Sequence, residues 1–155
     1  MKRFLSKLLK TKNTGSGDLF ASLVVLVALT LFCYYFINVI ADIDSRIQVD
    51  QVARKYILRM ESSGELSASE RSAMETDLSH IKAVKKAIDA GNAPVITWSG
   101  NNVAGTRAGY GGTITLSAKV PIYMTTYDPD TNIMGTIGRD RLVWVNVTKQ
   151  STAKY

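Results

Sequence analysis

The hydrophobic pattern divides the chain into three regions. From Leu19 to Ala41 apolar residues occupy every face and no residue is charged. From Val49 to Met60 they recur at i, i+3, i+4 and i+7, the spacing of a helix with one buried face. After Gly91 they alternate at every second position, as in a strand. The sequence therefore predicts an α+β fold with a long N-terminal helix, a second short helix and a small antiparallel sheet of three to four strands packed on the helices.

The first helix is expected to run without a break from Asp18 to about Ser62, apolar all round in its first half and one-sided in its second. Gly64 then ends it, because glycine readily takes the left-handed conformation after a helix. The predicted buried stripe consists of Val49, Val52, Ala53, Tyr56, Ile57 and Met60.

A capping box, Ser67 with Glu70, predicts the start of the second helix, and Gly91 with Pro94 its end. We expect one continuous helix, because its apolar residues keep a helical spacing throughout. These residues are Met74, Leu78, Ile81, Val84 and Ile88. His80 lies beside this stripe and is expected to be a surface or boundary residue.

Three strands are predicted, over Pro94–Trp98, Thr113–Met124 and Leu142–Thr148. Pro121 cannot donate to a ladder, which favours an edge position or a bulge there. The last strand is apolar on both faces and is therefore expected to be central. The residues expected to share the buried face of the second strand are Ile114, Leu116, Ala118, Val120, Ile122 and Met124.

The apolar region is long enough to span a bilayer. Its 23 residues would form a helix of about 34 Å, against about 30 Å for the hydrocarbon core. A buried core helix is usually shorter and carries a polar stripe. A signal sequence cleaved after Ala41 is the stronger alternative, but the run exceeds the usual length of a signal core and ends in the aromatic cluster Tyr34-Tyr35-Phe36.

Charge gives the expected orientation. The net charge is +6, from 19 basic and 13 acidic residues. Five of the basic residues precede Gly17, where no acid occurs, which predicts a cytoplasmic amino terminus. The remainder is almost neutral, which argues against nucleic-acid binding. We therefore expect a basic cytoplasmic leader (1–17), a transmembrane segment (18–41) and an extracellular α+β domain (42–155).

Few residues suggest a binding site. Asp128, Asp130 and Asn132 have the spacing of the first three ligands of a calcium loop, although Ile133 and Arg139 replace its glycine and its glutamate. The glycine-rich stretch 100–112 lacks the ending of a P-loop, so a loop that needs positive φ angles is the simpler interpretation.

Nothing in the sequence indicates catalysis. Cys33 lies in the apolar run, and one histidine without a second soft ligand excludes a structural zinc site. Asn146 begins a glycosylation sequon within the strand predicted to be central, so we discount it. We expect neither enzyme activity nor a cofactor nor a small-molecule substrate.

The order of a basic leader ending in glycine, an apolar helix that continues amphipathically, and a small sheet resembles type IV pilin-like proteins. It is most similar to pseudopilins of tight-adherence (Tad) pilus systems, in the group found in clostridial-type Gram-positive bacteria. The stretches that carry the resemblance are IDSRIQVDQVARKYILRMES (43–62), ITWSG (96–100) and QSTAKY (150–155).

The resemblance implies cleavage by a prepilin peptidase after Gly17 or Gly15. Such pilins usually keep a glutamate five residues past the cut, whereas this chain has Ser22 or Phe20 there. Asp18 is the only acid at the junction and would have to take the glutamate's role, pairing with the freed amino group of a neighbouring subunit.

The sequence thus predicts a minor pseudopilin or pilus-like structural subunit whose N-terminal helix contacts lipid and other pilus or secretion-system subunits. The alternative is a bitopic membrane protein whose extracellular domain binds a partner in a conjugation or secretion machine. A calcium-dependent adhesion module is the third hypothesis. The sequence leaves open which filament or machine is involved and whether the protein polymerises.

Overall fold

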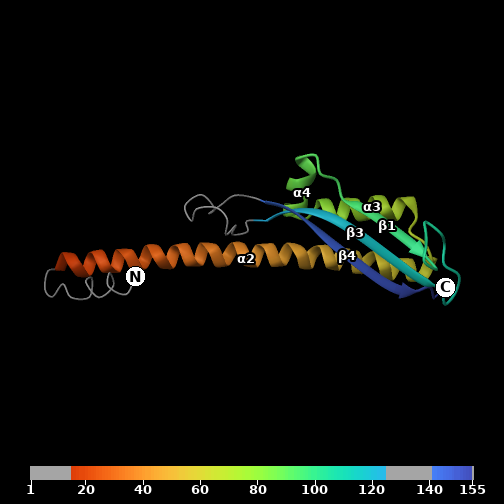
Figure 1. Ribbon diagram of the computed structural model, residues 1–155, viewed down its shortest axis with the longest axis horizontal. Coiled ribbons are helices and arrows are strands. Elements are labelled where there is room, and N and C mark those ends of the chain that lie inside the picture. Colours follow the sequence, from red (N-terminus) through yellow and green to blue (C-terminus); the bar gives the residue numbers. More distant parts are fainter. Residues whose placement is uncertain (1–14, 125–140, 155) are drawn as a thin grey trace. The chain divides into compact units, whose positions relative to one another are not determined.

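The computed structural model describes residues 15–124 and 141–154 and has the predicted α+β fold (Figure 1). The chain forms two compact units, Met1–Val39 and Ile40–Tyr155. The elements in chain order are α2 (Gly15–Ser63), α3 (Ala68–Ser79), α4 (Lys82–Asp89), β1 (Val95–Gly100), β2 (Val103–Ala104), β3 (Thr113–Met124) and β4 (Arg141–Thr152).

Within the first unit, the described residues form the apolar part of α2. Its large apolar side chains from Leu19 to Ile37 are between 44% and 72% exposed. The hydroxyls of Ser22 and Thr30 donate to helix carbonyls at 2.9 and 2.8 Å, so neither is left without a partner. An 18-residue window here has a mean hydropathy of 2.5. The helix is therefore long and apolar enough to span a membrane.

Within the second unit, the amphipathic part of α2 supplies one wall of the core, as predicted. Val52 is partly buried, and the other five residues of the stripe from Val49 to Met60 are at most 5% exposed. The helix ends where expected, because Gly64 has a φ of 74° and its amide donates to Met60 O at 2.7 Å.

The expectation of one continuous second helix is wrong, because α3 and α4 are separate. The capping box at Ser67 is present, and both of its hydrogen bonds form with Glu70. The break comes at His80 and Ile81, where Ile81 is extended with a ψ of 117°. The His80 amide is shared between Thr76 O and Asp77 O, both at 3.3 Å, which tightens the last turn of α3.

The break changes the direction of the chain but not the burial of its apolar residues. Met74, Leu78, Ile81 and Val84 are buried, and Ile88 packs against the core. After the break α4 lies against β3. Tertiary packing on the sheet therefore overrides the helical continuity that the spacing suggested.

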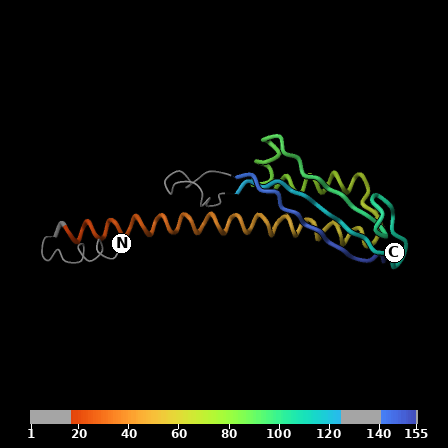
Figure 2. Tube along the Cα trace, viewed as in Figure 1, coloured from red at the N-terminus to blue at the C-terminus, as the bar shows by residue number. Residues whose placement is uncertain are grey.

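The sheet is antiparallel with the order β2-β1-β3-β4, and Figure 2 shows β3 and β4 as two long neighbouring traces. β3 has the predicted bounds, and all six residues predicted to share its inner face are buried. The hairpin from β1 to β2 was not predicted. Its turn residues, Asn101 and Asn102, have φ angles of 50° and 65°, as a type I′ turn requires.

The prediction that the last strand is central is wrong. β4 has β3 on one side and no other strand among the described residues. Its apolar residues on both faces have another cause: Val143, Val145 and Val147 pack against the core, whereas Trp144 is exposed on the outer face. Asn146 is exposed on this edge strand, so the sequon is not excluded by a central position.

Pro121 occupies a local edge, as expected. β1 pairs with β3 only as far as Val95 opposite Lys119, whereas the pairing with β4 continues through Pro121 opposite Trp144. Pro121 therefore lies where β3 has a neighbouring strand on one side only.

Candidate functional site

The predicted processing residues lie together at the start of α2. Gly15 is the first residue of the helix as described, and Asp18 is the acid of its first turn and is exposed. Ser22 donates its hydroxyl to Leu19 O, and Phe20 is 60% exposed. Asp18 therefore carries the only carboxylate of this segment that could pair with a cation on another chain.

The predicted calcium ligands Asp128, Asp130 and Asn132 lie outside the described residues, as do Ile133 and Arg139. Over 15–124 and 141–154, no group of three His, Cys, Asp or Glu side chains could hold a metal ion.

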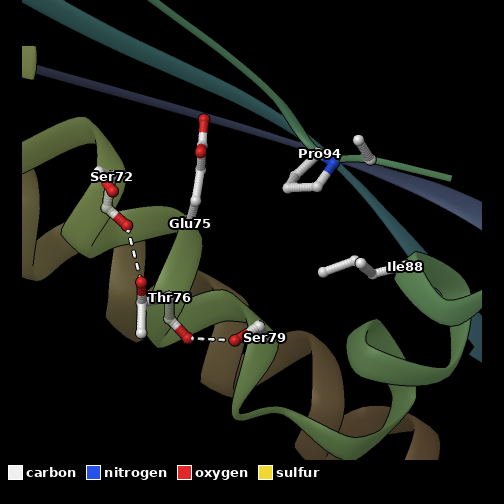
Figure 3. A pocket seen from close by; sticks show the side chains of 7 residues that line it. Ser72, Glu75, Thr76, Ser79, Ile88 and Pro94 are labelled. Atoms are coloured by element: carbon white, nitrogen blue, oxygen red, sulfur yellow. Dashed lines mark hydrogen bonds between the residues drawn. The ribbon is translucent and has the colours of Figure 1, made fainter.

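A hollow of about 370 Å³ lies between α3, α4 and the chain that enters β1 (Figure 3). Two of its hydroxyls bond back to their own helix: Thr76 donates to Ser72 O at 2.9 Å, and Ser79 donates to Thr76 O at 2.7 Å. Glu75 accepts from Arg71 at 3.4 Å. These groups are held in place by the helix, and none of these bonds activates a nucleophile.

Two carboxylates with lowered pKa values fasten α2 to the rest of its unit, in addition to Asp50, which pairs with Lys149 at 2.6 Å. Asp77 accepts from Lys55 at 2.6 Å and from Tyr56 at 3.0 Å. Hydrogen bonding to Lys55, more than to Tyr56, lowers the pKa of Asp77 below its ordinary value. Burial and the bond to Asp77 raise the pKa of Tyr56.

The second carboxylate is Glu61. It accepts from Lys154 at 2.8 Å and also from Ser151. Both bonds lower the pKa of Glu61 below its ordinary value, and the bond from Lys154 has the larger effect. Each carboxylate joins α2 to another part of the unit through hydrogen bonds to its charged form, which indicates a structural role.

The glycine-rich stretch forms the turn of the β1–β2 hairpin, strand β2 and the loop that follows it, rather than a phosphate cradle. Gly105 and Gly111 have positive φ angles, as the loop interpretation predicted. Gly100 is needed for space, because a Cβ there would lie 2.2 Å from Thr106 O. The Ala108 amide donates to Gly64 O at 2.9 Å, which ties this stretch to the end of α2.

One surface feature was not found from the sequence. Lys86 of α4 lies over the Tyr123 ring at 5.6 Å, and Lys119 lies over the Trp144 ring at 5.3 Å. Only the fold brings the lysines of α4 beside the aromatic residues of the sheet.

Comparison with protein-family models, with curated proteins and with solved structures found no match to this chain.

Proposed function

We propose that this chain is a membrane-anchored, pilin-like structural subunit, a minor pseudopilin of a type IV or Tad-like pilus or a related secretion apparatus. The observation that carries the proposal is the continuity of α2, a single helix of 49 residues. Its first part is apolar and exposed, and its last part forms the core of the second unit.

Each part of α2 has a distinct physical role in this proposal. The large apolar side chains from Leu19 to Ile37 need lipid or other helices around them, because water would oppose their exposure. The stripe from Val49 to Met60 is covered by the sheet and α3. One helix thus links an anchor to a folded domain, as a subunit that assembles through its helix requires.

The basic leader sets the proposed orientation. Five basic residues before Gly17 hold the amino terminus in the cytoplasm, and the second unit lies outside the cell. A prepilin peptidase then cuts after Gly15 or Gly17, and Asp18 pairs with the freed amino group of a neighbouring subunit.

The mature amino terminus tests this proposal. Intact-mass measurement on protein purified from native membranes is expected to show a start at Ser16 or Asp18. Replacing the cleaved glycine by leucine should leave the leader in place, and the matched control Gly109→Ala should be processed normally, because it lies far from the cut and a Cβ there meets nothing within 4 Å. A mature protein that begins at Met1 or at Asp42 contradicts the proposal.

The second candidate is a bitopic protein whose extracellular domain binds a partner. The exposed edge strand β4, with Trp144 38% exposed, favours it. This candidate predicts an intact leader in a membrane-bound protein, so the same mass measurement separates the two functions.

A further inference from the structure

Three lysines of α4 form a basic face on the second unit. Lys82, Lys85 and Lys86 are exposed, whereas Val84 and Ala87 of the same helix are buried in the core. Spacing at i, i+3 and i+4 places the three ammonium groups on one side of α4. Asp89 is the only acid of this helix, so α4 carries a net positive charge.

The face continues onto the outer surface of the sheet. Lys119 and Tyr123 lie on the outer face of β3, and Trp144 of β4 lies on the same face, opposite the buried Pro121. Lys86 covers the Tyr123 ring and Lys119 covers the Trp144 ring, which joins helix and sheet into one surface. We call this surface the basic patch; it consists of Lys82, Lys85, Lys86, Lys119, Tyr123 and Trp144.

The patch lies at the end of the second unit where α2 enters it. Met124 follows Tyr123 in β3, and its sulfur accepts from Arg46 Nη2 at 3.4 Å. Arg46 is five residues beyond Ala41, the last residue of the apolar run. Along a helix that separation is about 7.5 Å, comparable to the thickness of one headgroup layer, about 5 to 8 Å.

We propose that the basic patch binds the anionic lipid headgroups of the leaflet from which α2 emerges. This inference rests on the membrane anchor in the proposed function. Lysine ammonium groups attract anionic headgroups while their methylene stems lie on apolar surface, and tryptophan and tyrosine favour the membrane interface.

A hollow beside α4 gives the headgroups a place to bind. It measures about 520 Å³ and is lined by Ser79, His80, Lys82, Lys85, Ile88 and Asp89. The ammonium groups of Lys82 and Lys85 can donate to phosphate oxygens. Location favours lipid over a soluble acidic partner, because Met124, the residue after Tyr123 of the patch, contacts Arg46, which lies five residues beyond Ala41.

Lysine footprinting on the full-length protein tests the proposal. The protein is placed in nanodiscs of phosphatidylcholine alone or of equal parts phosphatidylcholine and phosphatidylglycerol, and the acetylation rate of each lysine is measured by mass spectrometry. Lys85, Lys86 and Lys119 should react about fivefold more slowly on the anionic discs. Lys154, whose side chain is 65% exposed and pairs with Glu61 at the other end of α2, serves as the internal control and should not change.

Salt and charge reversal distinguish the outcomes. The difference in lysine acetylation rate between anionic and neutral discs should vanish in about 0.5 M sodium chloride, where the Debye length is about 4 Å. The triple variant Lys82→Glu, Lys85→Glu, Lys86→Glu should abolish the slowing at Lys119, whereas Arg54→Glu on α2 should preserve it. Near-ultraviolet circular dichroism verifies that both variants are folded, and the double variant Lys85→Gln, Lys86→Gln should give an intermediate effect.

Equal rates on both kinds of disc overturn the proposal. Acetylation of the patch lysines that is slow on neutral discs as well, and that does not change with salt, also overturns the proposal. In that case something other than anionic lipid covers the patch. If the protein does not enter discs at all, the membrane anchor fails, and the proposed function falls together with this inference. Normal incorporation with unchanged lysine rates removes only the inference.

Discussion

Tyr56 Oη donates a hydrogen bond of 3.0 Å to Asp77 and so joins the buried face of α2 to α3. The same carboxylate accepts from Lys55 at 2.6 Å. The Tyr56 side chain is only 1% exposed, so its hydroxyl reaches Asp77 from within the core. The pair therefore fixes how α3 lies on α2.

Tyr56→Phe should lower the free energy of unfolding by about 1 kcal/mol, because one hydrogen bond is lost while the ring still fills its place. Thermal unfolding of the full-length protein in detergent, followed by near-ultraviolet circular dichroism, measures the change. Phe36→Tyr in the apolar run is a control outside this unit and should not alter the melting. An unchanged melting temperature in Tyr56→Phe would show that the bond contributes nothing.

Acid should destabilise the second unit through Glu61. Its pKa is lower in the folded protein than its ordinary value of 4.5, so the unfolded chain takes up the proton at higher pH. The stabilisation is complete above that ordinary value and is lost as the pH falls through the folded pKa. Unfolding curves from pH 6 downward should show a loss of stability that is smaller in Glu61→Gln. Equal slopes in both proteins would argue against this assignment.

Met60 and Leu58 offer a matched pair on one helix. Met60 is fully buried, whereas Leu58 is 54% exposed. Met60→Ala should cost about 2 to 5 kcal/mol of unfolding free energy, because it leaves a cavity in the core. Leu58→Ala should stay within about 0.5 kcal/mol. Denaturant unfolding compares them, and similar losses in both would contradict the burial of the stripe.

Gly100 and Gly109 form a second matched pair. A Cβ at Gly100 would lie 2.2 Å from Thr106 O and 2.6 Å from Ala108 N, whereas at Gly109 nothing lies within 4 Å. Gly100→Ala should destabilise the unit by about 1 to 3 kcal/mol, because the backbone must shift. Gly109→Ala should be close to neutral in the same melting experiment, and the reverse order would refute the close approach.

Charged substitutions test whether the apolar part of α2 lies in the membrane. Placing arginine at both Leu26 and Leu29 should oppose membrane insertion by about 6 kcal/mol. Alkaline extraction of cell membranes should then release the variant, while the parent protein stays in the pellet. Leu58→Arg, on the exposed face of the same helix, should remain in the membrane fraction. Retention of the double variant would argue against a lipid-embedded segment.

Periodicity predicted the buried faces of the fold well. The stripe on α2, the inner face of β3 and the capping box at Ser67 all follow from local spacing, which is fixed by the geometry of helices and strands. The break at Ile81 was not predicted, because Leu78, Ile81 and Val84 keep a helical spacing on both sides of it. Spacing reports which side chains are buried, and it does not report a turn between two short helices.

The position of β4 in the sheet was predicted wrongly because spacing reports burial and not strand pairing. A strand that is apolar on both faces has both faces covered or partly covered, but this says nothing about whether another strand pairs with its edge. Trp144 is an outer-face residue beneath Lys119, and no sequence pattern links two residues that distant. The basic patch was missed for the same reason, since it combines a helix with two strands.

Glu61 and Lys154 are 93 positions apart in the sequence, yet they are in direct contact. The second half of α2 is therefore fully covered only after β4 has been made and has paired with β3. Folding of this unit should accordingly be all-or-none and slow for its size, because the chain must close a long loop before the contacts that reward closure can form. Until then a nascent chain held in the membrane would leave part of the α2 stripe exposed, and association with a wrong neighbour is easiest at that stage.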